Sequence, residues 1–258
     1  MIAQDRFALN RSVYPGPDIA GFFELASQLD IRKVELRNDH PGGILDGRSP
    51  TQVDSLARAH RVRVITINAL QDFNVGARLP ALRLELEGLL EVAASIACEA
   101  IILCPSHSLA DGRSRDIAFR ETVDALKAFR PLFEASGVKG YVEPIGMKDC
   151  SLRSIIEATR AIRESGGGCF RTVYDTFHHF TGPDTDETIE KKYDVAFAGL
   201  VHVSGVSRAN TPSPTKKLRV GCGRREGYAT FAMATSYPNS LIRFARRCAT
   251  RSESRRRK

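Results

Sequence analysis

The strongest constraint on the fold is a regular alternation of short β-type runs with longer helix-type segments. Seven apolar, β-branched runs occur, at Phe7–Leu9, Lys33–Leu36, Val62–Ile67, Ala100–Cys104, Lys139–Val142, Arg171–Tyr174 and Leu200–Val203. The segments between them carry apolar residues three or four positions apart, which is the spacing of an amphipathic helix. Strands that alternate with helices predict an α/β protein with a parallel sheet.

The number of repeats then selects an architecture. Seven strand–helix units occupy residues 1–207, so eight units would need about 240 residues, which is the size of a (β/α)8 TIM barrel. A doubly wound open sheet is the alternative. Its glycine-rich dinucleotide fingerprint does not follow the first strand, and no P-loop motif occurs in the chain. We therefore expect a TIM barrel whose eighth unit is doubtful.

Capping residues indicate where the helices start. Pro17-Asp18, Ser49-Pro50, Ser114 and Ser151 each stand shortly before a helix-type segment. Serine and aspartate side chains accept hydrogen bonds from the first free amides of a helix, and proline fits its first turn. We expect one helix to begin at each of these four places.

Charge divides the chain into two regions. Residues 1–207 hold 24 basic and 28 acidic side chains, a net charge of −4, whereas residues 208–258 hold 14 basic and 2 acidic side chains, a net charge of +12. We interpret residues 1–207 as the barrel body and residues 208–258 as an atypical basic tail. The tail is an imperfect eighth unit, a selected basic extension, or the product of a shifted reading frame. The acidic body argues against a specific nucleic-acid partner.

Other broad classes are excluded by composition. Apolar residues make up 42% of the chain and charged residues 26%, which is ordinary for a globular protein. No apolar run reaches the roughly eighteen residues that cross a bilayer, so no membrane partner is expected. The first ten residues lack the apolar region of a secretory leader, and the six cysteines lack metal-binding or redox spacing. These features predict a cytoplasmic protein with reduced thiols.

Ionisable residues gather just past the strands, where a TIM barrel places its active site. Glu143, Asp175 and His202 follow or end the fifth, sixth and seventh runs. Two carboxylates and an imidazole suit one divalent ion, namely Mn²⁺, Zn²⁺, Co²⁺ or Fe²⁺. Each residue alone also has a structural interpretation: a solvated strand end, a helix cap and a buried core histidine. The three together favour a metal site.

Four segments carry a resemblance to a known family, namely Val34–Asp39, Val142–Gly146, Tyr174–His179 and Leu200–Ser204. They resemble the strands that form the metal site in the xylose-isomerase-like sugar isomerases and epimerases, with the inosose isomerases of inositol catabolism as the nearest group. The resemblance covers about residues 5–207 and implies a TIM barrel that acts on a sugar or cyclitol. It also implies that Glu143, Asp175 and His202 bind the metal and that Glu143 is catalytic.

The same resemblance suggests the residues that contact substrate. His178, three residues past Asp175, and Arg208, six past His202, match substrate-binding positions of relatives. Glu35, Arg37 and His107 lie at the same end of the predicted barrel and are further candidates. The implied reaction removes a proton beside a carbonyl to form an enediolate, which a divalent ion stabilises and a carboxylate reprotonates.

One part of the family pattern is missing. Relatives carry a second glutamate at the end of the eighth strand, but here Leu241–Cys248 holds none, and the only acids after residue 207 are Glu226 and Glu253. Tyr228–Met233 is long enough for a strand, yet no carboxylate closes it. Three alternatives to an active isomerase therefore remain: an inosose dehydratase-type lyase, an inactive barrel with a basic interaction tail, and an apurinic endonuclease-like enzyme. The last normally uses more histidines, and Asn68 stands where one is expected.

Overall fold

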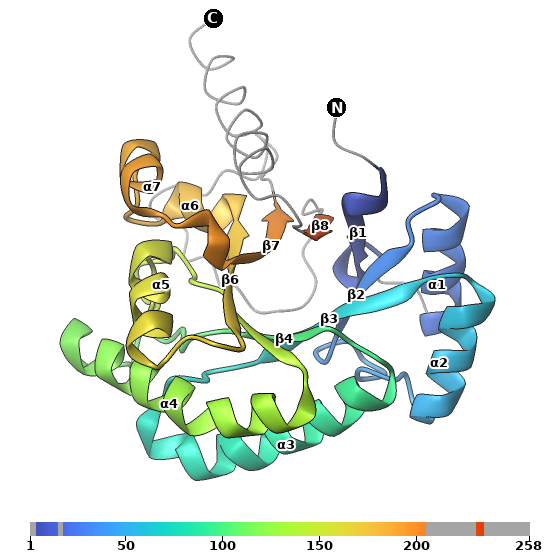
Figure 1. Ribbon diagram of the computed structural model, residues 1–258, viewed down its shortest axis with the longest axis horizontal. Coiled ribbons are helices and arrows are strands. Elements are labelled where there is room, and N and C mark those ends of the chain that lie inside the picture. Colours follow the sequence, from blue (N-terminus) through green and yellow to red (C-terminus); the bar gives the residue numbers. More distant parts are fainter. Residues whose placement is uncertain (1–3, 15–17, 205–230, 235–258) are drawn as a thin grey trace, which may run out of the picture.

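Seven parallel strands form the body of the molecule in the computed structural model, which describes residues 4–14, 18–204 and 231–234. Neighbours in the sequence are neighbours in the sheet (Figure 1). The strands are β1 (Phe7–Asn10), β2 (Lys33–Arg37), β3 (Arg63–Leu70), β4 (Ala100–Leu103), β5 (Lys139–Val142), β6 (Phe170–Asp175) and β7 (Ala198–Val203). The seven strands predicted from the sequence are confirmed, with each end shifted by three residues at most and the fifth strand unchanged.

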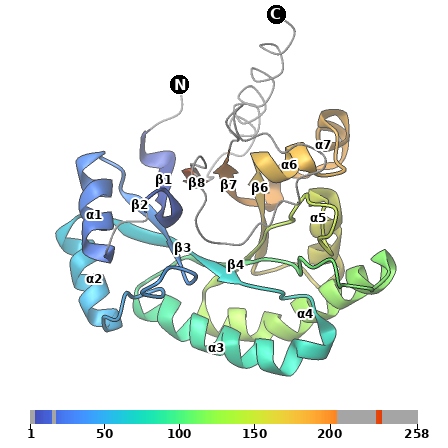
Figure 2. The ribbon, with the colours of Figure 1, turned by 180° about the vertical axis from the view of Figure 1, so that it is seen from behind.

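An eighth strand closes the barrel, but it runs in the opposite direction to the others. Strand β8 (Phe231–Ala234) pairs antiparallel with both β7 and β1 and lies between them (Figure 2). It overlaps the predicted strand Tyr228–Met233, of which residues 228–230 lie outside the described part of the chain. An antiparallel neighbour needs no crossover helix, unlike a parallel one. The expected TIM barrel is therefore present, with an inverted last strand.

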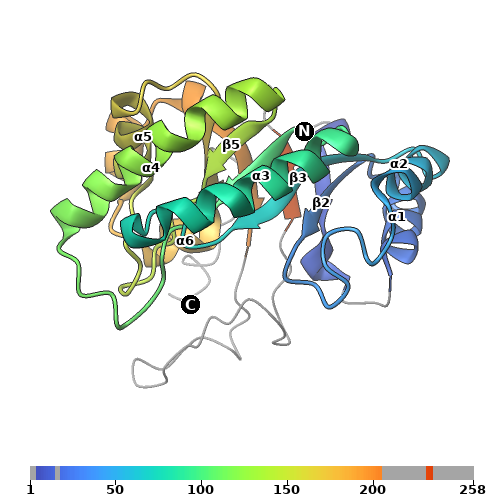
Figure 3. The ribbon, with the colours of Figure 1, turned by 90° about the horizontal axis from the view of Figure 1, so that it is seen from below.

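Helices lie around the outside of the strands (Figure 3). The described α-helices are α1 (Ile19–Gln28), α2 (Pro50–Ala59), α3 (Leu79–Ser95), α4 (Arg115–Ser136), α5 (Ile155–Glu164), α6 (Thr176–Thr181) and α7 (Asp186–Lys192). Helices α1 and α2 lie on one side and α4 and α5 on the other (Figure 3). Short 3₁₀ turns lie at Gln4–Arg6, Arg11–Val13, Gly76–Arg78 and Val195–Phe197. In the described ranges, none of the helices is both long and apolar enough to cross a bilayer.

Three of the four predicted helix starts are confirmed. Asp18, Ser49 and Ser114 are the N-caps of α1, α2 and α4, and each side chain accepts a backbone N–H of the first turn. The prediction at Ser151 is wrong. Ser154 caps α5 instead, because its hydroxyl accepts from the amides of Ile156 and Glu157. The hydroxyl of Ser151 is used elsewhere and donates to the carbonyl of Ser106.

Two apolar layers hold the barrel together. The larger lies between the strands and the helices and includes the fully buried rings of Phe22, Phe129 and Phe170. The smaller consists of side chains from several strands, among them Ile65 and Ile102. The four cysteines in the described ranges, Cys98, Cys104, Cys150 and Cys169, are free, as expected for reduced thiols, whereas Cys222 and Cys248 lie outside those ranges.

Candidate metal centre

The carboxyl ends of three neighbouring strands bring Glu143, Asp175 and His202 together. Glu143 directly follows β5, Asp175 is the last residue of β6, and His202 is paired with Asp175 across the β6–β7 ladder. One potential ligand atom from each lies within 4.8 Å of the other two. All three side chains are buried. The convergence expected from the sequence is therefore present, and metal binding by these residues stays a prediction.

The imidazole of His202 is held at both of its nitrogens. Its Nδ1 lies 2.8 Å from Oε1 of Glu143 and 3.8 Å from Oδ2 of Asp175. Its Nε2 lies 3.0 Å from Oε2 of Glu35. Nδ1 is thus the nitrogen that faces the two carboxylates of the triad, while Nε2 faces away from them.

The charges of Glu35 and Glu143 shift the pKa of His202, and the charge of His202 shifts the pKa of Glu143. Burial alone would lower the pKa of His202, but the negative charges of Glu35 and Glu143 outweigh it and raise that pKa well above its ordinary value. Burial alone would raise the pKa of Glu143, but the charge and hydrogen bond of His202 hold it well below the usual carboxyl range. In the metal-free protein, His202 is therefore a buried cation and Glu143 a buried anion.

Asp175 uses its two oxygens for different tasks. Oδ1 accepts the backbone N–H groups of Phe177 and His178 at 2.7 and 3.0 Å, which caps α6. Oδ2 accepts the hydroxyl of Ser204 at 2.8 Å and is the oxygen nearer to His202. The helix cap that sequence reasoning set against a ligand role is thus present, and it occupies only one oxygen.

Glu35 lies deeper than the other candidate residues and has no solvent-exposed surface. Its Oε2 accepts the hydroxyl of Thr66 at 2.7 Å, and its Oε1 accepts the side-chain amides of Asn10 and Asn68. Sequence reasoning did not single out Thr66. Thr66 and Asn68 are two residues apart in β3, so they face the same side, and a polar pair at that spacing within an apolar strand was the available signal.

His178 and Arg37 act on Glu143 through their charges. After the stronger effects of burial and His202, the charges of His178 and Arg37 also lower the pKa of Glu143. Nδ1 of His178 is buried without a hydrogen-bond partner, and a small pocket beside it is also lined by Asp175 and Arg153. Arg37 is paired with Asp39 through two hydrogen bonds of 2.7 and 2.8 Å. Substrate contact by His178 and Arg37 stays a prediction.

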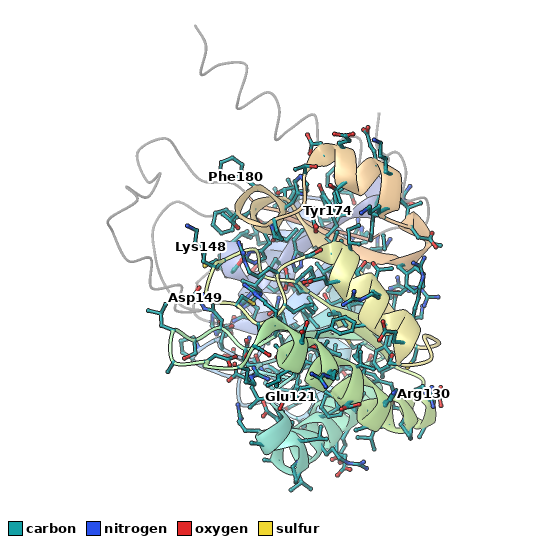
Figure 4. The ribbon with its side chains drawn as sticks, turned by 90° about the vertical axis from the view of Figure 1, so that its left-hand side faces the viewer. Glu121, Arg130, Lys148, Asp149, Tyr174 and Phe180 are labelled. Atoms are coloured by element: carbon teal, nitrogen blue, oxygen red, sulfur yellow. The ribbon has the colours of Figure 1, made fainter. Side chains whose placement is uncertain are left out.

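His107 takes part in a loop-to-loop contact. Its Nε2 lies 2.9 Å from Oδ1 of Asp149, and its backbone forms an isolated antiparallel bridge with Cys150. Asp149 and Lys148 lie at one edge of the molecule (Figure 4). His107 thus ties the loop after β4 to the loop after β5, and substrate contact by it stays a prediction. Arg208 lies outside the described residues.

The donor set fits a divalent ion. Two carboxylates and one imidazole are ligands that Zn²⁺, Mn²⁺, Co²⁺ and Fe²⁺ accept, and three protein ligands leave positions for other groups. The fourth protein ligand anticipated from the resemblance does not follow β8. Phe231 is paired with Val203 at the site end of the barrel, whereas Ala234 is paired with Leu200 towards the opposite end. Strand β8 therefore ends away from the triad.

Comparison with known proteins places this geometry in a family context. The sequence model described as "Xylose isomerase-like TIM barrel" matches residues 23–234. A xylose isomerase domain-containing protein from Salmonella typhimurium LT2 is 31% identical, with a TM-score of 0.75, and the match covers 96% of this chain and 86% of that one. Among the curated proteins, none matches the chain.

Two more distant structures share the fold. The IolI protein, whose crystal structure contains a bound zinc atom, is 18% identical with a TM-score of 0.68, and the match covers 74% of this chain and 69% of that one. A 3-keto-D-glucoside 4-epimerase from E. coli is 15% identical with a TM-score of 0.62, covering 75% and 76%. At these identities, the likeness concerns the fold alone.

Proposed function

The chain belongs to the xylose isomerase-like TIM-barrel family, and from this premise we propose that it is a divalent-metal-dependent isomerase or epimerase of a ketose or keto-cyclitol such as an inosose. The observation that carries the proposal is the buried triad of Glu143, Asp175 and His202 at the carboxyl ends of adjacent strands. These three residues would hold the ion. When bound, a divalent ion supplies positive charge that stabilises the negative charge developing on an enediolate.

Glu143 is the proton-transfer group in this proposal. It is ionised, because His202 keeps its pKa low, and an ionised carboxylate can accept a proton from the carbon beside a carbonyl. Its Oε1 contacts His202. Its other oxygen, Oε2, lies 3.8 Å from the thiol of Cys104, which is a weak donor. Glu143 therefore has an acceptor oxygen without a strong hydrogen bond among the described contacts.

His178 and Arg37 would orient the substrate. The charges of both lower the pKa of Glu143, and both side chains can donate hydrogen bonds to hydroxyl or carbonyl oxygens. The zinc of the IolI structure and the keto-sugar named for the E. coli epimerase support a metal-dependent reaction on a small carbohydrate. The substrate class rests on this likeness and on the oxygen-binding character of the site.

The direction of β8 favours a second candidate, which is a barrel that binds metal and carbohydrate but turns substrate over poorly. Enediolate chemistry in this family uses a second carboxylate from the end of the last strand. Here β8 ends away from the triad. In the part of the chain that the structure describes, the last strand supplies no second carboxylate, so proton transfer on one face of the substrate would lack that group.

Metal analysis combined with an activity assay tests both candidates. Purified protein should contain about one Zn²⁺, Mn²⁺, Co²⁺ or Fe²⁺ per chain, and Asp175→Asn should lower this content because it removes a charged ligand but keeps the acceptor that caps α6. Asp124→Asn, at an exposed position of α4, is the control. Conversion of inososes or ketoses supports the isomerase, whereas metal binding without conversion supports the second candidate. Equal metal content in wild type and Asp175→Asn would contradict both.

A further inference from the structure

We propose that Glu35 is a positioning residue that holds the Nε2–H of His202 and thereby directs Nδ1 at the metal. The inference rests on the proposed function, because it requires that the triad binds a metal. It assigns Glu35, the middle residue of β2, a different task from the substrate contact expected from the sequence. The carboxylate has no solvent-exposed surface, so it acts through His202.

The direction of the hydrogen bond follows from the partners of Glu35. Thr66 donates to Oε2 at 2.7 Å, and Asn68 donates to Oε1 at 3.3 Å. Asn10 donates to Oε1 as well. Both carboxylate oxygens of Glu35 are thus already acceptors of side-chain donors, so Glu35 is the acceptor in these contacts. The nitrogen of His202 that lies 3.0 Å from Oε2 must therefore carry a proton.

A proton on Nε2 decides what the other nitrogen can do. A neutral imidazole carries one proton, so fixing it on Nε2 leaves the lone pair on Nδ1. Nδ1 is the nitrogen that faces Oε1 of Glu143 and Oδ2 of Asp175, at 2.8 and 3.8 Å. A carboxylate that orients the second nitrogen of a histidine in this way raises its basicity and fixes its ring as a metal ligand.

Glu35 and the side chains that support it come from a different part of the barrel than His202. Asn10, Glu35 and the Thr66–Asn68 pair belong to β1, β2 and β3, whereas His202 belongs to β7. Strand β8 and β1 stand between β7 and β2 in the closed sheet. Side chains of the first three strands therefore hold the Nε2 side of the imidazole, whereas Glu143, after β5, and Asp175, at the end of β6, face its Nδ1 side.

Zinc affinity of Glu35→Gln tests the proposal without an activity assay. The glutamine side chain would keep the volume of the glutamate but lose its charge, and the affinity of the variant for zinc should fall by about 10–100-fold, as for other carboxylates that support a ligating histidine. Competition with a chromophoric chelator measures this. The matched control is Glu87→Gln on the exposed face of α3, which should bind zinc like the wild type.

A spectroscopic measurement separates positioning from a general structural role. In ¹⁵N-labelled, zinc-loaded wild type, the His202 ring should show a protected Nε2–H and a zinc-bound Nδ1, and this Nε2–H signal should weaken or shift in Glu35→Gln. Thr66→Val serves if Glu35→Gln does not fold. It removes one donor to Glu35 and keeps the carboxylate, and we expect a loss of zinc affinity of about threefold or more.

The outcomes are distinguishable. Wild-type zinc binding that is at least tenfold tighter than that of Glu35→Gln, with a changed Nε2–H signal, supports the proposal. Wild type that binds zinc, together with Glu35→Gln or Thr66→Val that binds it equally and shows the same ring signals, overturns the role of Glu35 and leaves the proposed function standing. Wild type that binds no divalent ion overturns both.

Discussion

The Nδ1 atom of His202 lies 2.8 Å from Oε1 of Glu143, and the two side chains form an almost completely buried ion pair. In the metal-free protein, the proton of this pair occupies the direction from which His202 would bind an ion. A metal at the triad must therefore replace a proton as well as bind three ligands.

Zinc binding should accordingly become tighter as the pH rises. The pKa of His202 is raised well above its ordinary value of 6.5 in the metal-free protein, so the ring is protonated around neutral pH and zinc must displace that proton. Below the raised pKa, affinity should increase by up to about tenfold per pH unit, and above it the increase should level off. Calorimetry in two buffers of different ionisation enthalpy should detect about one proton released per zinc. Binding that releases no proton would contradict the assignment.

Gly146 should tolerate no side chain, although it lies outside the triad. A Cβ at this position would stand 2.0 Å from the carbonyl oxygen of His178 and 2.6 Å from the backbone nitrogen of Gly182. Backbone atoms cannot rotate away, so Gly146→Ala should push α6 from the loop that carries Glu143 and destabilise the fold by about 1–3 kcal/mol. Denaturant unfolding measures this, and zinc affinity should fall in parallel.

Gly88→Ala is the control for that variant. Gly88 lies on the exposed side of α3, and a Cβ there would meet nothing within 4 Å. Alanine is the better helix former, so this substitution should stabilise the protein by about 0.5–1 kcal/mol. Equal effects of the two substitutions would show that the close approach at Gly146 does not constrain the site.

Arg113→Leu should cost stability and change the response to acid. The guanidinium binds Asp111 at 2.6 and 2.8 Å and also binds Glu121, the hydroxyl of Ser106 and the carbonyl of Asn74. The Arg113 side chain is 18% exposed. Its loss removes the charged donor from these partly buried acceptors, and the free energy of unfolding should fall by about 2 kcal/mol.

The acid response follows from the pKa of Asp111. Hydrogen bonds from Arg113 are the main cause that holds this pKa well below its ordinary value of 3.8. The resulting stability is present above about pH 4, the ordinary value, and is lost as the pH falls towards the lowered pKa. Unfolding free energies between about pH 2 and pH 5 should therefore fall more steeply for wild type than for Arg113→Leu. Arg83→Leu, at an exposed position of α3, should follow wild type.

Replacing the C-terminal region should raise turnover. A graft in place of residues 208–258 that supplies a parallel strand ending in glutamate would add the second proton-transfer group. General acid–base groups contribute about 10²–10⁴-fold, so isomerase turnover should rise by that order. The same graft with glutamine at that position is the control. A chain that isomerises inosose at a full enzymatic rate without any graft would refute the argument.

The repeating part of the fold was predictable because each of its signals is local. Apolar β-branched runs form the strands, and single capping residues such as Asp18 and Ser49 mark where a helix starts. The same capping signal predicted the wrong start for α5, because two serines lie close together there and Ser154, not Ser151, is the cap. Either serine side chain could cap a helix, and the position of the loop between β5 and α5 determines which of them does.

The site was predictable to the extent that strand ends fix it. Glu143, Asp175 and His202 converge because parallel strands end at the same side of a sheet. The contact between Glu35 and His202 was not predictable, since it joins β2 to β7 and depends on the closure of the barrel. The direction of β8 was likewise not predictable, because so short an apolar run has the same sequence pattern in a parallel and in an antiparallel strand.

The contact between Glu35 and His202 has a consequence for the order in which the protein acquires its function during folding. The two residues are 167 positions apart in the chain, and contacts of such long range form slowly because a large loop must close first. A ribosome must have made β7 before the ring that would bind metal can be oriented. Early strands and helices can assemble without it. Competence to capture an ion is therefore among the last properties that a newly made chain gains, and among the first that a failure of barrel closure removes.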